Sequence, residues 1–402
     1  MRHLDGKTVA FGVTGSIAAV ECVKIVHELR RRGAEVHAVM TEAAEKIVHE
    51  YALEFATGNP VVTEITGDVE HVELVGELES DFESFRDTDA KADLFLIAPA
   101  TANTVGKIAS GVDDTTVTTF ATTAIGSGIP TLIAPAMHEP MYDHPGISEN
   151  LEKLREWGIR VIPPKIEEDK AKLADREDIA LECERAVSDS ALEGERIVIT
   201  SGKTVEPLDP VRVITTKSSG KMGRALAEEA YVRGADVTII HNYDGEVRYG
   251  NSVQVESAEE MIEAAEREAS AGSSIFISAA AISDYTVESN DSKIRSGQDL
   301  VLDLKKVPKL IDRVREIDPS VYIVGFKAET GGERSELISN AREVMERAGL
   351  DLVVANDASV MGSDDTQVEI VEDDWIETVR GDKRTVSDAI LDNVERDIEQ
   401  SF

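Results

Sequence analysis

The stretch SSGKMGRALAEEAYVRGADVTII (218–240) carries the pattern that decides the fold of the second half of the chain. It begins with a Gly-rich turn, continues with apolar residues at helical spacing, stops at Gly234 and ends in an apolar run typical of a strand. The preceding RIVITSGKT (196–204) is typical of a strand that enters a loop. Strand, turn, helix and strand in this order indicate the βαβ unit of a doubly wound α/β domain.

The Gly220–Lys221 pair in this stretch does not belong to a P-loop. That motif requires Ser or Thr directly after Gly-Lys, where Met222 stands, and a Gly five residues before Gly220, where Thr215 stands. Exposed N–H groups at a helix start can bind phosphate in another way. We therefore predict the helix-start half of a phosphate cradle, whose loop is lengthened by VEPLDPVRVI (205–214).

The same pattern occurs near the N-terminus in KTVAFGVTGSIAAVECVKIVHELRRRGAEVHAVMT (7–41). It predicts a strand over 8–13, a Gly-containing turn, a helix from Ile17, a stop at Gly33 and a second strand. Two such units about half a chain apart predict two doubly wound, Rossmann-like α/β domains. We place the boundary in the small, polar link near 188–194, which gives domains over 1–190 and 191–402.

Further apolar runs complete the two predicted sheets. They cover 92–100 and 129–137 in the first half, and 273–281, 321–330 and 351–357 in the second. Ligands of open α/β sheets bind beyond the carboxyl ends of the strands. The residues that follow each run are therefore the candidates for binding and catalysis.

The composition restricts the class of ligand. The chain of 402 residues has 78 acidic and 42 basic residues, a net charge of −36, and the acidic residues are spread along it. Because binding of duplex DNA requires neutralisation of phosphates, nucleic acid is not expected as a main ligand. A carboxylate-coated surface is interpreted as an adaptation to a high-salt cytoplasm. No signal peptide, membrane span or disulfide framework is predicted, so we expect a soluble, cytoplasmic protein.

The first half resembles the FMN-binding Cys decarboxylase family. The resemblance rests on residues 12–19, HVEL (71–74), ADLFLIAPATANTVGKIASGV (92–112) and PAMHEPMY (135–142). It is closest to phosphopantothenoylcysteine decarboxylase, in which oxidation of the substrate thiol by the flavin creates an electron sink for loss of CO₂. The resemblance implies His71 as the catalytic residue that handles a proton. It implies substrate contacts from Met137, His138 and Met141, and FMN contacts from Gly15, Ser16, Ile17, Thr41, Pro99, Thr101 and Asn103.

Two departures from that family's pattern concern the decarboxylase chemistry. His138 stands where the family has an Asn that contacts the substrate carboxylate, and a His can also donate to a carboxylate. The region that matches the family's flap, IEEDKAKLADREDIA (166–180), lacks the proton-donating Cys. Lys170 and Lys172 are the candidates for that role.

The second half closely resembles the phosphopantothenate–cysteine ligase family. The 196–227 segment is followed in family order by AAAISDY (279–285), SKIRSG (292–297), KKVPKLI (305–311), GFKAET (325–330) and VVANDAS (353–359). That family activates a carboxylate as an acyl-nucleotide with loss of pyrophosphate, and the amine of cysteine then displaces the nucleotide. The resemblance implies that phosphate of phosphopantothenate or of the nucleotide is held by Ser218, Ser219, Gly220 and Lys221. It implies nucleotide contacts from Ser278, Ala279, Ala280, Asp284, Lys293, Val307, Pro308, Lys309, Leu310 and Phe326.

The same resemblance implies Mg²⁺ at Asp284 and leaves the choice of nucleotide open. Thr216 stands where bacterial members have an Asn tied to turnover of the acyl intermediate, so we include it in the substrate site. Val344 and Ala348 stand where bacterial members have two nucleotide-binding lysines. CTP is favoured as co-substrate, and ATP is the alternative.

The two resemblances together indicate an archaeal-like bifunctional enzyme of coenzyme A biosynthesis, with a flavoprotein-type N-terminal and a ligase-type C-terminal domain. It would join cysteine to 4′-phosphopantothenate and decarboxylate the product to 4′-phosphopantetheine. Two alternatives remain. The flavin domain can have lost catalysis and serve assembly or regulation, or the whole chain can be a non-enzymatic flavin-binding interaction protein, which the intact ligase motifs disfavour. Subunits are expected to form a homo-oligomer with flavin sites at their contacts.

Overall fold

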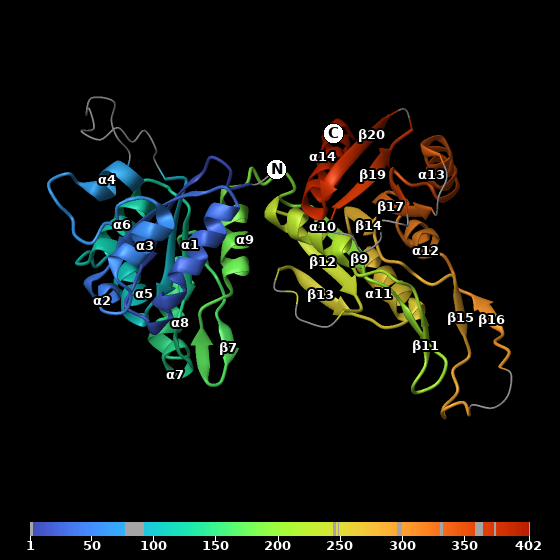
Figure 1. The fold of residues 1–402 in the computed structure, drawn as a ribbon, viewed down its shortest axis with the longest axis horizontal. Coiled ribbons are helices and arrows are strands. Elements are labelled where there is room, and N and C mark those ends of the chain that lie inside the picture. Colours follow the sequence, from blue (N-terminus) through green and yellow to red (C-terminus); the bar gives the residue numbers. More distant parts are fainter. Residues whose placement is uncertain are drawn as a thin grey trace. The chain divides into compact units, whose positions relative to one another are not determined.

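The computed structural model describes residues 3–76, 92–243, 247, 249–295, 300–329, 333–357, 365–373 and 375–401. Contacts within the chain divide it into two compact units, Met1–Ser188 and Asp189–Phe402. Both are built as predicted from mainly parallel sheets with helices on their faces (Figure 1).

The sheet of the first unit has the order β2-β1-β3-β4-β6, and all of its strands are parallel. Alternate residues of β1 enter different cores: Val9 and Phe11 pack in the cluster that contains residues of α1, α3 and α9, whereas Ala10 packs in the cluster that contains residues of α6 and α8. Helices therefore cover both faces of this sheet, as in a doubly wound fold.

The elements of the first unit are β1 (Thr8–Val13), η1 (Ile17–Glu21), α1 (Cys22–Arg31), β2 (Glu35–Met40), α2 (Glu42–Glu45), α3 (Glu50–Thr57), α4 (Glu70–Val75), β3 (Leu94–Ala100), α5 (Ala102–Ala109), α6 (Thr116–Gly126), β4 (Thr131–Pro135), β5 (Met137–His138), α7 (Glu139–Tyr142), α8 (Pro145–Glu156), β6 (Arg160–Val161), β7 (Lys165–Glu167), β8 (Lys170–Lys172) and α9 (Arg176–Val187).

The second unit contains a larger sheet of order β13-β12-β9-β14-β17-β18-β19-β20, in which the last two strands run antiparallel to their neighbours. Ile197 and Ile199 of β9 pack with α10 and α14, and Val198 packs with α11, α12 and α13. Two short hairpins, β10–β11 and β15–β16, extend from this sheet (Figure 1).

The elements of the second unit are β9 (Arg196–Ser201), β10 (Val205–Pro207), β11 (Val213–Thr215), α10 (Lys221–Val232), β12 (Asp236–His241), β13 (Asn251–Gln254), α11 (Ala258–Ser270), β14 (Ile275–Ser278), β15 (Tyr285–Val287), β16 (Leu304–Lys306), α12 (Leu310–Ile317), β17 (Tyr322–Glu329), α13 (Arg334–Ala348), β18 (Leu352–Asp357), β19 (Asp365–Val371), β20 (Ile376–Asp382) and α14 (Lys383–Ser401).

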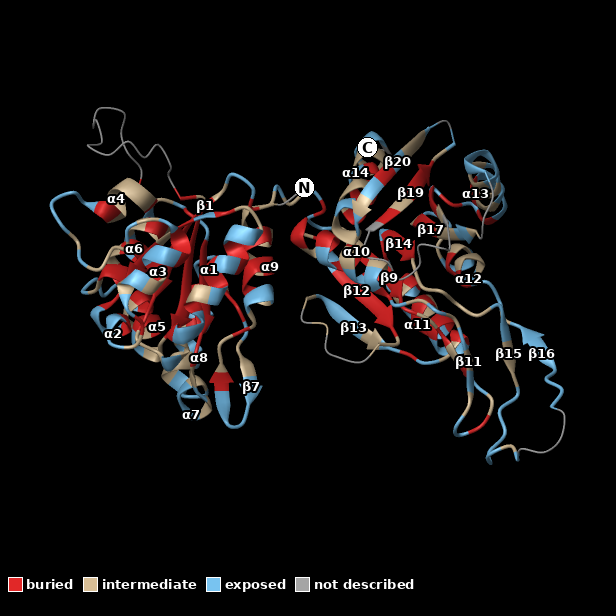
Figure 2. Ribbon diagram, in the orientation of Figure 1, coloured by how far each residue is buried: buried red, intermediate tan, exposed pale blue. Residues whose placement is uncertain are grey.

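The structure differs from the predicted elements at the first helix. A 3₁₀ turn, η1, takes up Ile17 and Val20, which are exposed, and the α-helix begins only at Cys22. The apolar periodicity therefore extended the predicted helix by one turn. In both units the central strands of the large sheet are buried and the helices expose their outer faces, whereas the edge strand β13 and the short strand β16 are mostly exposed (Figure 2). Among the described residues, no helix is long and apolar enough to cross a bilayer.

Candidate active sites

In the first unit, the carboxyl ends of β1 and β3 are joined by the side chain of Thr14. Its hydroxyl donates to the carbonyl of Pro99 at 2.6 Å and accepts from the backbone N–H of Thr101 at 3.1 Å. The chain places β2 on one side of β1 and β3 on the other, so this is the switch point of the sheet. Ligands of open α/β sheets bind at such a point.

Helix starts and small residues form a cradle at this switch point. Ser16 caps η1 and also donates to the carbonyl of Ala136 at 3.2 Å, while Thr101 caps α5. A Cβ on Gly15 would lie 2.5 Å from the Cβ of Ala43, so only glycine fits here. N–H groups and hydroxyls that converge at a sheet edge suit a phosphate. The cradle thus fits the phosphate end of a flavin nucleotide.

The other predicted flavin contacts occupy different environments around the cradle. Ile17 and Asn103 are exposed and accessible to a ligand. Thr41 is buried, and its hydroxyl accepts from the N–H of Ala44 to cap α2. Its hydroxyl is thus already engaged in capping.

His71 lies apart from this cradle. It is in the first turn of α4, its ring packs edge-on against Phe120 at 6.3 Å between centroids, and no described residue hydrogen-bonds its buried Nδ1. The carbonyl of Leu74 accepts from Ala92, just before the amino end of β3. Because β3 has seven residues, its two ends lie about 20 Å apart. Figure 1 accordingly places α4 and α7 at opposite ends of the unit.

The predicted substrate contacts Met137 and His138 form β5, which pairs with the β7–β8 hairpin. This hairpin is the region that replaces the Cys-containing flap, and its register places Lys170 directly opposite His138. Met141, in the following helix α7, is 47% exposed. The structure therefore brings the flap region onto the 137–141 segment.

The two flap lysines differ in their partners. Lys172 lies 3.0 Å from Glu168 and 3.2 Å from Glu167, and these bonds raise its pKa. Lys170 is exposed and faces His138 across the strand pair. Cys183 is fully buried in α9, so its thiol is not accessible to a bound substrate, and burial also raises the pKa of this thiol.

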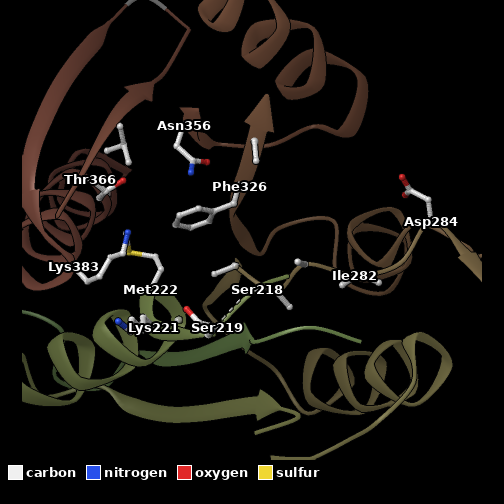
Figure 3. Close-up of a pocket in the computed structure, with 17 residues that line it drawn as sticks. Ser218, Ser219, Lys221, Met222, Ile282, Asp284, Phe326, Asn356, Thr366 and Lys383 are labelled. Carbon is white, nitrogen blue, oxygen red and sulfur yellow. Dashed lines mark hydrogen bonds between the residues drawn. The ribbon is translucent and has the colours of Figure 1, made fainter. Parts of the chain in front are cut away.

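In the second unit, a pocket of about 360 Å³ opens where α10 begins (Figure 3). It brings together many of the predicted ligase residues, which come from the loop before α10 and from the ends of β14 and β17. These are Ser218, Ser219, Gly220, Lys221, Ala279, Ala280, Asp284 and Phe326.

Two glycines allow α10 to begin against the end of β9. Gly220, with a φ of 73°, is the N-cap, and a Cβ there would lie 3.1 Å from the Cα of Gly202. A Cβ on Gly223 would lie 2.3 Å from the Oγ of Ser201. Since α10 has twelve residues, its free N–H groups and dipole favour an anion in the pocket.

The rim of the pocket carries a further group of predicted nucleotide contacts. Lys309 forms an ion pair with Asp284, and the N–H of Val307 donates to the carbonyl of Asp284 at 3.0 Å. Pro308 and Leu310 lie on either side of Lys309, although Leu310 itself is buried. Ser278 is the buried last residue of β14. Within the described ranges, Asp284 belongs to no group of three metal-ligating side chains.

Thr216 and Lys293 do not line the pocket. Hydrogen bonds of Thr216 itself and of Ile294, next to Lys293, fix the backbone of the two segments. The Thr216 hydroxyl donates to the carbonyl of Ala281 at 3.2 Å, next to the pocket wall. Lys293 is exposed beside Ile294, whose N–H donates to Asp209.

The structure does not bring Val344 and Ala348 to the pocket. Ala348 is buried, and Val344 packs against the core beneath α13. Val344 and Ala348 therefore contribute to the core rather than to a nucleotide site. The basic residues on the exposed face of α13 include Arg342 and Arg347.

Three polar residues that line the pocket were not among the predicted site residues. Asn356, the penultimate residue of β18, lies in the VVANDAS motif (353–359), whereas Thr366 of β19 and Lys383 of α14 were not predicted. Thr366 is 6% exposed, and no described residue bonds its hydroxyl. Figure 3 shows Phe326 projecting into the pocket, with Lys383 at one end and Asp284 at the other. No local sequence signal marks Thr366, because pairing of β18 with β19 brings it there.

Comparison with known proteins matches each unit separately and the chain as a whole. Residues 1–187 match the Flavoprotein family, and residues 192–398 match the DNA/pantothenate metabolism flavoprotein C-terminal domain. The coenzyme A biosynthesis bifunctional protein CoaBC of Thermococcus kodakarensis is 52% identical over 399 residues, which cover 98% of this chain and 96% of the relative. CoaBC of Methanocaldococcus jannaschii is 40% identical over 398 residues, covering 98% and 94%. CoaBC of Vibrio cholerae is 34% identical over 379 residues, covering 90% of each chain. With both halves matched in order over nearly its full length, the chain belongs to the family of coenzyme A biosynthesis bifunctional proteins.

Proposed function

We propose that the second unit joins cysteine to 4′-phosphopantothenate through an acyl-nucleotide, and that the first unit decarboxylates the product to 4′-phosphopantetheine. The observation that carries this proposal is the pocket at the start of α10, where a phosphate-binding helix end, an aromatic ring and a carboxylate meet. A carboxylate becomes a good electrophile only after activation. A site that holds nucleotide phosphates beside the acid provides that activation.

Each part of the pocket has a role in this ligation. Ser218, Ser219 and the N–H groups that follow Gly220 bind phosphate, and Lys221 adds positive charge. Phe326 offers a flat apolar surface to the nucleotide. Lys293 neutralises the triphosphate. Asp284 would hold the Mg²⁺ of the nucleotide, and the ion would offset the negative charge of the phosphates.

The first unit binds FMN at the Thr14–Thr101 cradle, where Gly15, Ser16 and Thr101 hold its phosphate. The bound flavin supplies the redox chemistry that makes decarboxylation possible. His138 donates to the substrate carboxylate, and Lys170, opposite it in the strand pair, provides the final proton. His71 handles the proton of the oxidation step.

We also propose that a second copy of the chain completes the flavin site. His71 lies at the other end of its own sheet from the cradle, so one copy alone does not join them. Large apolar side chains of η1 and α3 are exposed, namely Ile17, Tyr51 and Phe55. Exposed apolar groups of this size suit a subunit contact. Such an assembly functions in the cytoplasm with small-molecule substrates only.

Mixing of two inactive variants tests the shared site. Gly15→Ala chains lack the cradle and His71→Ala chains lack the proton-handling group. Co-expression of the two is expected to restore part of the CO₂ release that neither shows alone. If mixed oligomers stay inactive, or if the protein is monomeric by light scattering, the shared site is wrong.

The ligase and decarboxylase activities are tested independently. Purified protein is expected to release pyrophosphate over many turnovers only when cysteine, phosphopantothenate and a nucleoside triphosphate are all present, faster with CTP than with ATP, and without cysteine to release at most one equivalent per active site. It is also expected to be yellow and to release CO₂ from synthetic phosphopantothenoylcysteine. Pyrophosphate release without CO₂ release would favour the alternative, a ligase whose flavin domain serves assembly or regulation. If neither CTP nor ATP supports pyrophosphate release, the ligase proposal is wrong.

A further inference from the structure

The loop of the β10–β11 hairpin contains a buried carboxylate that binds another segment of the chain. Asp209 is 2% exposed. One oxygen, Oδ1, accepts from the N–H groups of Val211 and Arg212 at 2.8 Å each, which closes the hairpin turn. The other, Oδ2, accepts from the N–H of Ile294 at 3.0 Å, 85 residues away along the chain. A buried carboxylate whose bonds go to backbone N–H groups fixes those groups in place.

The Arg212 side chain binds the same segment, and we call the arrangement of Asp209, Arg212 and Ile294 the clip. Its Nη1 donates to Oδ2 of Asp209 at 2.9 Å and to the carbonyl of Ile294 at 2.9 Å. The N–H of Asn290 donates to the carbonyl of Leu208 at 3.0 Å. The 290–294 segment is therefore attached to the hairpin at both of its ends.

The hairpin also leads directly to the phosphate-binding start of α10. After β11 the chain continues through Thr216, bonded to Ala281, to the Ser218–Lys221 loop that lines the pocket. The clip lies just before β11 in the sequence and binds the backbone of Ile294, the residue that follows Lys293. The β10–β11 hairpin thus connects the start of α10 to the segment that carries Lys293.

We propose that Asp209 is a positioning residue of the ligase, which holds the Lys293 segment in place for the nucleotide triphosphate. This inference rests on the proposed function, since it takes Lys293 as the triphosphate-binding group. Asp209 is not among the residues that line the pocket at the start of α10, so its effect on the ligase passes through the Ile294 backbone.

Asp209→Asn separates the two roles of the carboxylate. The Asn oxygen can keep the two turn bonds from Val211 and Arg212. Its NH₂ group then faces the N–H of Ile294 and Nη1 of Arg212, both donors, so the bond to the segment is lost. The hairpin turn survives and the clip opens.

Kinetics on the full chain test the inference. The KM for CTP, or for ATP if that is the better co-substrate, is expected to rise roughly tenfold in Asp209→Asn, the effect of a lost charge-assisted hydrogen bond. The KM for cysteine is expected to stay within about twofold. Lys293→Ala is expected to raise the nucleotide KM at least as much, and Asp209→Asn/Lys293→Ala no further, because coupled residues are not additive.

A matched control uses a carboxylate with similar bonds on another turn of the same unit. Asp318 accepts from the N–H and the hydroxyl of Ser320 at 2.9 and 2.7 Å, before the amino end of β17 and so away from the pocket. Asp318→Asn is expected to leave the nucleotide KM unchanged. An equal rise in this control, or additive effects in the double variant, would overturn the inference.

Hydrogen exchange supplies a readout that does not depend on activity. The Ile294 amide is expected to lose protection in ligand-free Asp209→Asn and to keep it in Asp318→Asn. Unchanged protection, or an unchanged nucleotide KM in Asp209→Asn while Lys293→Ala raises it, overturns the positioning role and leaves the ligase function intact. An unchanged nucleotide KM in Lys293→Ala itself instead overturns the assignment of Lys293 and, with it, this use of the clip.

Discussion

At the scale of single residues, Gly15 is a position of the flavin cradle at which no side chain fits. Gly15→Ala would place a methyl group 2.5 Å from the Cβ of Ala43, so the cradle must open. We expect loss of the yellow colour and of the flavin absorbance in the purified protein. Gly106→Ala is the matched control, because the nearest atom to its Cβ lies at 3.7 Å and Ala favours the interior of α5. Colour lost in both variants, or kept in Gly15→Ala, would contradict the cradle.

His71 is the residue whose role depends most on its surroundings. Its Nδ1 is buried and no described residue hydrogen-bonds it, which leaves this nitrogen open to a ligand in the proposed shared site. We expect His71→Ala to lower CO₂ release by about 10²–10⁴-fold, the usual contribution of a general acid or base. Pyrophosphate release by the second unit should not change. Full CO₂ release by this variant would remove His71 from the mechanism.

At the scale of elements, Arg233 connects two helices of the second unit. It follows α10 as its C-cap, is 4% exposed, and binds Glu229 in α10 and Asp388, Asp392 and Glu395 in α14, at 2.7 to 2.9 Å. Burial alone lowers the pKa of the guanidinium, and the carboxylates of Glu395 and Glu229 more than offset this. The cluster is therefore an ion-pair clamp between α10 and α14.

Removal of the Arg233 guanidinium takes a cation away from the buried carboxylate of Glu229 and from the partly buried carboxylates of Asp388 and Glu395. Arg233→Leu is expected to lower the free energy of unfolding of the second unit by about 3–5 kcal/mol. Arg347→Ala, which loses an exposed pair with Asp312 at 3.9 Å, is expected to cost less than about 1 kcal/mol. Urea titrations in a Trp157→Phe background leave Trp375 as the only tryptophan, so fluorescence reports this unit. Equal losses in both variants would contradict the clamp.

The elements also show how far the sequence predicts the fold and where it stops. Buried parallel strands are continuous apolar runs, so β3, β9 and β14 could be read directly. In contrast, β19 alternates polar with apolar residues at the antiparallel end of the sheet, and no run marks it. The Ser218–Lys221 loop could also be predicted, because its motif consists of residues that are neighbours in the sequence. Thr366 and Lys383 were missed because strand pairing and the following helix bring them to the pocket.

At the scale of the whole molecule, the surface charge sets the conditions for stability. A net charge of −36 in 402 residues opposes compaction through self-repulsion. The Debye length falls from about 10 Å at 0.1 M salt to about 3 Å at 1 M, so repulsion between neighbouring carboxylates is largely screened at the higher concentration. Added salt is therefore expected to reduce the destabilisation caused by repulsion within the carboxylate coat.

We accordingly predict that the urea midpoint of unfolding rises as KCl is increased from 0.1 to 2 M. A variant with several exposed glutamates neutralised should be more stable than the parent at 0.1 M, and its midpoint should depend less on KCl because less repulsion remains to be screened. The two midpoints should then converge at high salt. Suitable substitutions lie on exposed helix positions of the second unit: Glu263→Gln, Glu343→Gln and Glu346→Gln. A parent midpoint that is flat or falls with KCl would mean that charge repulsion does not limit stability, and the salt-adapted interpretation of the surface would then be wrong.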